Sequence, residues 1–332
     1  NNMSINKRSN PKGATPPTGP RVCRAAAETP QPEAVVLPGT CIPDIYQKVT
    51  DGAVPQFQDP VVQELDALLV RTLEPHARMA YHLTVTGPGG DAPHTCGVLD
   101  TKAGGIGYLS TSEGLPMCKE CNGPMSLVAQ INLAQMPEEV QETLKLGEEG
   151  LIQVYMCYNV EAMCETCIPF SGGQCIRYVS GTELKSARTR DAILALYTEA
   201  RAGQAPTEGI PLNEAPVTGV VRDQQDFPKG PELDEVLSTL EHTEEQKEKI
   251  SEHSWTRMEA QGYEGLAIGG WFDWVQGVEY PDCPDCGTAM TGTVLNIDSM
   301  DEIGLMLGDG GTAQVCQCPN HQGQLAMVWA CG

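Results

Sequence analysis

The sequence predicts an α+β, sheet-rich fold built by internal duplication, with two pseudo-symmetric halves that each carry a Cys-x2-Cys zinc knuckle. Three observations lead to this prediction. Two such cysteine pairs occur, Cys118 with Cys121 and Cys283 with Cys286. Each pair is followed by an apolar, strand-like run, and the two runs are similar in composition. The residues around the two pairs also match at a constant sequence offset.

Length and composition bound the class of protein before any motif is considered. With 332 residues, the chain is longer than a single hydrophobic core usually supports, so two domains are expected. Apolar residues make up 40% but aromatic ones only 5%, so the core must rely on aliphatic side chains. The formal charge of -23 opposes binding to nucleic acid or anionic membranes and favours a basic partner. No apolar run reaches about 20 residues, so no membrane span is expected.

The N-terminal stretch differs from the rest of the chain. Residues 1–33 carry a net charge of +3 and are rich in Pro, Ser and Asn, which predicts a disordered basic tail over residues 1–43. Because the whole chain carries -23, the residues after 33 carry -26. The stretch lacks the apolar core of a secretory signal, so we expect a cytoplasmic protein. Its arginine residues and small number of acidic residues are also compatible with an organelle transit peptide, so import into an organelle is the alternative.

The fourteen cysteines indicate metal binding more than a disulfide framework. The chain is long for a disulfide scaffold and has no secretory signal. Each Cys-x2-Cys pair lies beside turn residues, so its two thiolates can converge on one tetrahedral ion. A redox dithiol would instead need a thiol at a helix N-terminus in a βαβ unit. Strand-like runs over 126–133 and 291–298 follow the pairs here, which favours metal.

The residues around the two pairs repeat. The glycine pair 104–105 matches 269–270, and Pro116 and Met125 match Pro281 and Met290, all at an offset of 165. Further on, residues 153–157 match 314–318 at an offset of 161, which requires a shorter loop in the second copy. These matches predict a duplication, with halves over 44–180 and 217–332 joined by a helix and linker over 181–216.

The duplication also nominates the distant ligands. Cys157 and Cys318 are equivalent, so each should complete the site opened by its own pair, and structural zinc needs a fourth ligand. Two zinc ions are therefore predicted, and the fourth ligands are Cys164 and His321. In the first copy, a second knuckle of Cys164 with Cys167 could leave out Cys157. In the second, Cys316 or Cys331 could replace His321. The predicted ligands are Cys118, Cys121, Cys157 and Cys164, then Cys283, Cys286, Cys318 and His321.

Capping signals and apolar periodicity predict the remaining elements. Asp59 before Pro60 is typical of a helix start, and Thr243 with Gln246 forms a capping box. The expected elements are helices from Pro60 to Pro75, from Pro137 to the glycines 147 and 150, over 187–200, from Glu232 onwards and near 244–258, and a strand over 217–227. Residues 232–259 hold nine acids and three bases. A solvated helix face is the favoured interpretation, and an acidic surface for a basic partner is the alternative.

Several segments together resemble the YwqG-like family, a domain-of-unknown-function group. They are residues 269–276, the second knuckle with Met290, residues 308–311, and the ending 318–321 with 329–331. The resemblance covers about residues 100–332; the first copy departs from it where Ile106-Gly107 replace the aromatic pair Trp271-Phe272. A more distant likeness is to the programmed-cell-death-two family of ribosomal-protein chaperones. The resemblance implies a mixed, sheet-rich fold with pseudo-twofold halves and no known catalytic activity.

Enzyme motifs are missing from the sequence. It contains no Gly-x-Ser-x-Gly elbow, no phosphate-binding Gly-Lys-Ser/Thr loop and no His-Glu-x-x-His pair. We therefore expect a non-enzymatic, zinc-stabilised protein that binds a basic protein partner. The YwqG-like resemblance implies a toxin-neutralising, immunity-type role. The alternatives are a chaperone or escort of a basic client such as a ribosomal protein, or a structural subunit of a large assembly.

Overall fold

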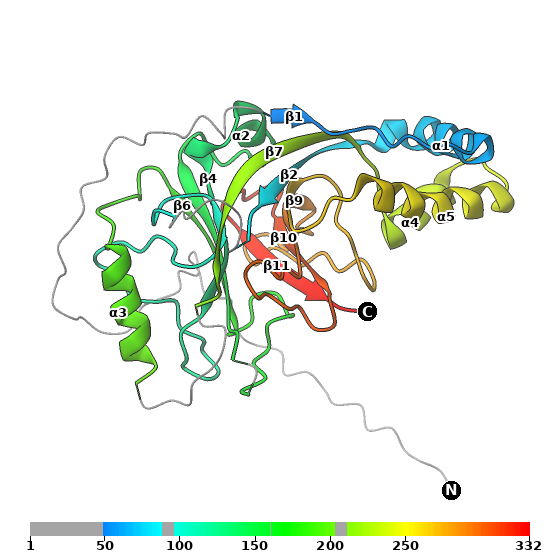
Figure 1. The fold of residues 1–332 in the computed structure, drawn as a ribbon. Coiled ribbons are helices and arrows are strands. Elements are labelled where there is room, and N and C mark those ends of the chain that lie inside the picture. Colours follow the sequence, from blue (N-terminus) through cyan, green and yellow to red (C-terminus); the bar gives the residue numbers. More distant parts are fainter. Residues whose placement is uncertain (1–48, 88–95, 160, 203–210) are drawn as a thin grey trace, which may run out of the picture.

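In the part of the chain that the structure describes, the strands form one eleven-stranded sheet at the centre of the molecule (Figure 1). The structure is a computed structural model that describes residues 49–87, 96–159, 161–202 and 211–332. The predicted basic tail over residues 1–43 lies outside these ranges. Within them, α1 (Pro60–Leu73), α4 (Gly230–Thr239) and α5 (Glu244–Gln261) lie on one side of the sheet and α3 (Arg190–Ala200) on the other, so the expectation of a sheet-rich α+β fold is confirmed.

Two antiparallel runs of four strands make up the outer parts of the sheet. The first run consists of β3 (Lys102–Gly104), β4 (Ser126–Asn132), β5 (Gly150–Met156) and β6 (Gln174–Ser180). The second consists of β8 (Leu266–Gly269), β9 (Gly292–Asp298), β10 (Thr312–Gln317) and β11 (Leu325–Ala330). Between them lie β2 (Arg78–Val85) and β7 (Glu214–Asp226), and the short β1 (Val49–Asp51) pairs with β7 in parallel.

The strand order exchanges β2 and β7 between the two halves of the sequence. The order is β11-β10-β9-β8-β2-β7-β3-β4-β5-β6. β2 precedes β3 in the chain but pairs with β8, where Ala80 lies opposite Gly269. β7 precedes β8 but pairs with β3, where Glu214 lies opposite Gly104. Each run thus takes its fifth strand from the other half of the sequence. The two predicted halves therefore share one sheet, and their division into domains stays a prediction.

Corresponding irregularities recur in the two runs. On β4, Val128 is the extra residue of a β-bulge, because Leu127 and Ala129 pair with consecutive residues of β5. On β9, Val294 occupies the same place opposite β10. A bulge inserts one residue and increases the local twist. Two bulges at matching positions agree with the duplication that the sequence predicts.

The helices begin mostly where the sequence predicts. They are α1 (Pro60–Leu73), α2 (Glu138–Leu144), α3 (Arg190–Ala200), α4 (Gly230–Thr239) and α5 (Glu244–Gln261), with the short 3-10 helices η2 (Glu74–His76) and η3 (Leu133–Gln135). The Asp59 cap and the Thr243–Gln246 capping box are both present.

The boundaries of α2 and α3 differ from the prediction for reasons that the structure shows, and α4 begins at Gly230, two residues before the predicted start. α2 ends at Leu144 rather than at a glycine, because Lys145 takes the left-handed conformation (φ 55°) and closes the helix with its amide on Gln141 O. α3 begins after residue 187, because the Thr189 side chain caps it by accepting from the Ala192 amide at 3.2 Å. A cap side chain sets the boundary more strongly than helix propensity does.

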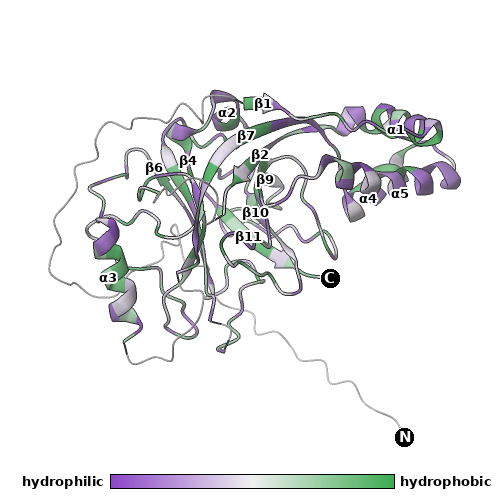
Figure 2. Cartoon of the chain, in the orientation of Figure 1, coloured by the Kyte–Doolittle hydropathy of each residue, from purple (hydrophilic) through white to green (hydrophobic). Residues whose placement is uncertain are grey.

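The main core is one aliphatic cluster that spans both runs. It contains Ile131 and Ile152 from the first run and Ile268, Ile297 and Val315 from the second, each fully buried. Figure 2 shows apolar residues along these strands and mixed polarity on the helices. The two ends of the sheet, β6 and β11, also contact each other, so the sheet is nearly closed. The expectation of an aliphatic core is confirmed.

Helices α1, α4 and α5 project as a helical arm beyond the ends of the central strands β2 and β7 (Figure 1). The arm has its own small core, which includes Leu73, Leu237 and Ile250. Arg257 on α5 bonds Asp66 on α1 at 2.7 Å, and this ion pair is largely buried. The arm is therefore held together by its own contacts.

The two glycine pairs that mark the repeat form equivalent turns. Residues 104–105 and 269–270 all have φ between 63° and 73°, a left-handed conformation that favours glycine. A carboxylate lies against each turn and accepts from the amide that follows it: Glu214 in the first copy and Asp226 in the second. Each carboxylate also pairs with a lysine, at 3.4 Å and 2.9 Å respectively. These glycines are needed for steric reasons. A Cβ at Gly105 or Gly270 would meet the carboxylate, and a Cβ at Gly104 or Gly269 would meet a backbone carbonyl oxygen.

Candidate metal centres

The first knuckle is a tight turn that presents two thiols. The Cys118 amide donates to Gly123 O at 2.8 Å, and the Asn122 amide donates back to Cys118 O at 3.0 Å. Asn122 takes a left-handed conformation (φ 57°), which asparagine tolerates better than most residues. This turn places Cys118 and Cys121 on the same side of the loop between β3 and β4.

Cys157 and Cys164 approach this knuckle from the loop between β5 and β6. Cys157 follows directly on β5, and its amide donates to Gly173 O at 2.8 Å. The four sulfur atoms of Cys118, Cys121, Cys157 and Cys164 all lie within 4.8 Å of one another. We call this group the four-cysteine cluster. Its Cys121 and Cys157 sulfurs are 3.7 Å apart. A tetrahedron with metal–sulfur distances of about 2.3 Å has edges of about 3.8 Å, so the spacing suits one ion.

The second knuckle repeats the hydrogen bonds of the first. The Cys283 amide donates to Thr288 O at 2.9 Å, and the Gly287 amide donates to Cys283 O at 2.8 Å. Gly287 has φ 67°, in the place that Asn122 occupies in the first knuckle. The aligned prolines and methionines have a structural role too. The Met290 amide donates to Pro281 O at 2.9 Å, and the Met125 amide donates in the same way to Pro116 O in the first copy.

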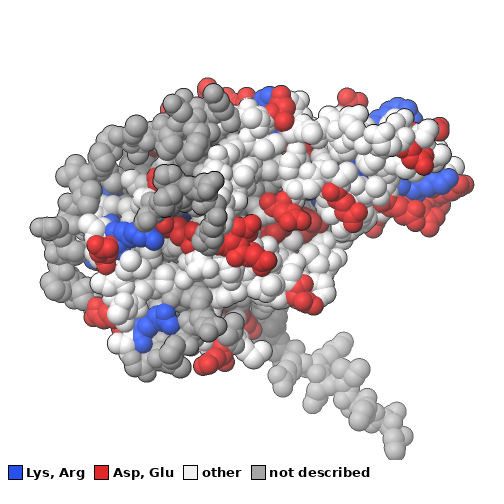
Figure 3. All heavy atoms as spheres, in the orientation of Figure 1, with Lys and Arg blue, Asp and Glu red and all other residues white. Residues whose placement is uncertain are grey.

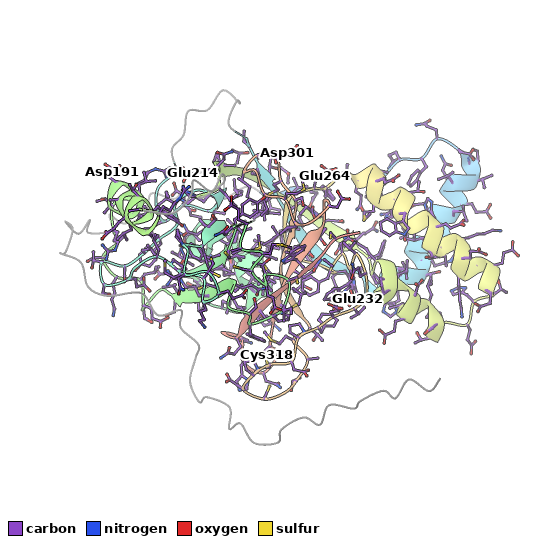
Figure 4. The ribbon with its side chains drawn as sticks, turned by 90° about the horizontal axis from the view of Figure 1, so that it is seen from below. Asp191, Glu214, Glu232, Glu264, Asp301 and Cys318 are labelled. Carbon is purple, nitrogen blue, oxygen red and sulfur yellow. The ribbon has the colours of Figure 1, made fainter. Side chains whose placement is uncertain are left out.

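Cys318 and His321 complete the second group. The ligand atoms of Cys283, Cys286, Cys318 and His321 also lie within 4.8 Å of one another, and we call them the histidine-containing cluster. The Cys286 and Cys318 sulfurs are 3.7 Å apart, and His321 Nδ1 lies 3.6 Å from Cys283 Sγ. Cys318 and His321 lie on the loop after β10, and Cys283 and Cys286 lie on the loop between β8 and β9. Figure 4 shows Cys318 away from the helical arm.

The thiols of each cluster differ in how readily they ionise. The hydroxyl and amide of Thr288 lower the pKa of Cys286 to about 6. Burial raises the pKa of Cys121, but the Gly123 amide and the neighbouring thiols outweigh it and hold this pKa below its ordinary value. Burial raises the pKa of Cys157 and Cys283. Cys121 and Cys286 therefore ionise more readily than Cys157 and Cys283, whose deprotonation the charge of a metal ion would favour.

The structure brings together all eight predicted ligands in the two predicted groups of four. Cys167 is exposed and stands outside the four-cysteine cluster, so the alternative knuckle of Cys164 with Cys167 is not the arrangement found. Cys316 is buried in the apolar cluster beside Cys318 and is not among the grouped donors, and Cys331 is also outside them. Among the other cysteines, Cys175 is disulfide-bonded, which the sequence did not lead us to expect.

A buried ionic group near α3 was not predicted. The Lys102 side chain is 0% exposed and pairs with Glu214, which also accepts from Arg190 at 2.7 Å. Burial lowers the pKa of Lys102, and burial raises the pKa of Glu214 less than the two cations lower it. Glu214 lies beside α3 in Figure 4. No sequence signal could have found this group, because Lys102 lies on a three-residue strand.

Comparison with known proteins matches most of the chain to one family. The family model, described as a domain of unknown function (DUF1963), matches residues 101–317. The match runs from β3 to the end of β10 and stops just before Cys318. No curated protein matches the chain. In the part of the chain that the structure describes, none of the helices has the length and apolar character that crossing a membrane requires.

Proposed function

The chain belongs to the DUF1963 family of domains of unknown function, and we propose that it is a zinc-stabilised protein-interaction protein without enzymatic activity. The observation that carries the proposal is the closure of both clusters. Each provides four protein donors within 4.8 Å of one another, which fills a tetrahedral ion completely. A catalytic zinc keeps one position open for water or substrate, so sites of this kind stabilise structure.

Zinc is the metal that these donors fit best. Four thiolates, or three thiolates with one imidazole, in a tetrahedral arrangement are typical of structural zinc; iron is the competing occupant of a four-thiolate site. Such an ion would tie each knuckle to the end of a distant strand, β5 or β10. Stabilisation by two such ions would compensate for the limited apolar burial of a chain with few aromatic residues.

Elemental analysis of the natively purified protein tests this assignment. We expect two zinc ions per chain, and one after either Cys118→Ser or Cys283→Ser. Cys167→Ser is the matched control, since this thiol is exposed and lies outside both clusters. It should leave both ions bound. A content near zero in the native protein, or iron in place of zinc, would contradict the proposal.

Charge supports a basic protein as the partner. The chain carries -23, and two zinc ions bound by seven thiolates and one neutral imidazole would change this to -26. Figure 3 shows acidic side chains along the helical arm. On α4, on α5 and in the turn between them, eight acids are exposed: Asp234, Glu235, Glu241, Glu244, Glu245, Glu248, Glu252 and Glu259. A basic surface would be attracted to the arm over roughly one Debye length, about 8–10 Å at physiological salt.

Affinity capture with the intact, metal-loaded protein tests the partner. We expect a basic protein whose binding weakens as salt rises. Neutralising Glu248 and Glu252 on the arm should weaken capture more than neutralising Glu138 and Glu142 on α2, which changes the same charge elsewhere. Salt-independent capture of an acidic protein would contradict the electrostatic argument, and turnover of a substrate by the purified protein would overturn the non-enzymatic assignment.

The identity of the captured protein distinguishes the roles that the resemblances suggest. A secreted toxin would support the immunity-type role of a YwqG-like protein. A ribosomal protein would support the escort role, which rests on the distant likeness to the programmed-cell-death-two family alone. Stoichiometric capture within a large complex would favour a structural subunit.

A further inference from the structure

The loop that supplies two ligands to the four-cysteine cluster also contacts the other half of the molecule. We call residues 157–173 the bridging segment; the structure describes all of them except residue 160. Directly after the ligand Cys157, the Tyr158 hydroxyl donates to Gly304 O at 3.1 Å and accepts from the Met306 amide at 2.9 Å. Both partners belong to the turn between β9 and β10.

Beyond Cys164, the bridging segment reaches the apolar core that surrounds part of the histidine-containing cluster. Trp329 on β11 donates from Nε1 to Thr166 Oγ1 at 3.2 Å. Phe170 packs against the apolar cluster that contains Cys283 and Cys318, two ligands of the second group. Its backbone is left-handed (φ 61°), which is unfavourable for a bulky residue. Such a conformation persists only where surrounding contacts hold it.

The same segment is fastened to the first knuckle. The Lys119 amide donates to Gly172 O at 3.0 Å, and the Glu165 amide donates to Glu120 Oε2 at 2.9 Å. Together with Cys157 and Cys164 themselves, these contacts mean that an ion in the four-cysteine cluster would hold the segment at both ends. The position of Phe170 against the apolar core around Cys283 and Cys318 therefore depends on the order of the four-cysteine cluster.

We propose that the two metal sites are thermodynamically coupled through the bridging segment. Metal in the four-cysteine cluster orders the segment and seats Phe170 against the apolar core around Cys283 and Cys318. It thereby raises the affinity of the histidine-containing cluster for its own ion. This inference rests on the proposed metal binding. Linkage requires the effect to be reciprocal, so metal in the second cluster raises the affinity of the first by the same factor.

Cobalt titration of the full chain measures the coupling. Co²⁺ occupies tetrahedral thiolate sites, and its visible spectrum differs between four thiolates and three thiolates with imidazole, so each site is followed separately. Removing the first site with Cys121→Ser and Cys164→Ser should lower the Co²⁺ affinity of the histidine-containing cluster about 5- to 150-fold, the usual range for coupled sites. Removing the second site with Cys283→Ser and Cys286→Ser should lower the affinity of the first by the same factor.

Variants that keep all eight ligands test the route of the coupling. Phe170→Ala and Tyr158→Phe should bind two Co²⁺ ions, but the affinity of the second site should fall toward that of the protein without the first site. Adding Cys121→Ser and Cys164→Ser to Phe170→Ala should then cause little further loss. Met163→Ala is the matched control in the same segment, because its side chain is 86% exposed, and it should leave the coupling intact.

The outcomes separate the two proposals. If neither cluster binds Co²⁺ or Zn²⁺, the proposed metal function fails. If both ions bind, but the affinity of the second site is unchanged both by loss of the first site and by Phe170→Ala, metal binding stands and the coupling is wrong. If the ligand variants fail to fold, the Co²⁺ affinity of the second site in Phe170→Ala, compared with wild type, still tests the coupling.

Discussion

Substitution of Gly104 by alanine tests the physical reason for the glycine pair that marks the repeat. A Cβ at this position would lie 1.9 Å from Asn213 O, a backbone atom, and the residue has φ +63°. Gly310 is a matched control, because it has φ +77° and nothing lies within 4 Å of its Cβ position. The two substitutions therefore share the backbone strain and differ in the clash.

The magnitudes follow from these two contributions. A left-handed conformation costs a residue with a side chain about 1–2 kcal/mol, so Gly310→Ala should lower the free energy of unfolding by that amount. Gly104→Ala adds a clash with backbone that must move, which costs about 1–3 kcal/mol more. The total expected for Gly104→Ala is therefore about 2–5 kcal/mol. Gly269→Ala, the equivalent position in the second copy, meets Met79 O at 2.8 Å and should resemble Gly104→Ala.

Urea unfolding, monitored by tryptophan fluorescence, provides the measurement. The free energies of unfolding of the variants are compared with one shared m-value, the slope of the unfolding free energy against urea concentration. The midpoint should fall further for Gly104→Ala and Gly269→Ala than for Gly310→Ala. Losses that agree within about 0.5 kcal/mol for all three positions would refute the close-approach argument, since only backbone strain would then remain.

Three further predictions concern buried charge, pH and helix capping. Glu214→Gln should lower the unfolding free energy by about 3–5 kcal/mol, because it leaves the buried Lys102 ammonium without its carboxylate, and Lys102→Met should cost less in the same urea assay. Burial lowers the pKa of His82 to about 4. Between about pH 6.5 and 4, the unfolded chain therefore binds a proton on His82 that the folded chain does not bind. The stability contributed by the neutral His82 is fully present above about pH 6.5 and is lost as the pH falls towards 4. His82→Gln should remove up to about 3 kcal/mol of that pH dependence, and an unfolding free-energy difference from wild type that stays constant from pH 7 to 4.5 would count against it. Thr243→Ala should cost about 1 kcal/mol in thermal or urea unfolding, while Thr243→Ser should keep most of the stability because it retains the capping oxygen.

The ligand groups were largely predictable because their signals are local. The two thiols of a Cys-x2-Cys pair are brought together by a turn of a few residues, so spacing alone indicates them. Cys157 and Cys318 lie far along the chain, and only the internal match between residues 153–157 and 314–318 nominated them. The structure places both at the ends of equivalent strands, beside their knuckles.

The choice of fourth ligand shows where local reasoning stops. Cys164 and Cys167 are three residues apart in one loop, and either could have been a ligand by spacing. The bridging segment directs Cys164 towards the knuckle and leaves Cys167 exposed, because the segment is anchored at Thr166 and Phe170 by the other half of the molecule. A contact of that kind has no signature in the loop itself.

By itself, the sequence determined the knuckles, most helix starts, the strands that follow the knuckles and the repetition of the whole unit, because turns, caps and apolar periodicity act over a few residues. Only the tertiary structure decided that β2 and β7 exchange between the halves, that Lys102 is buried against Glu214, and that the loop of one candidate metal site packs on the apolar core beside the other. These features join residues that are more than one hundred positions apart, and such pairings depend on the packing of the complete sheet. The physical reason is that backbone hydrogen bonds make any two strands able to pair, so side-chain burial across the whole molecule selects the partner.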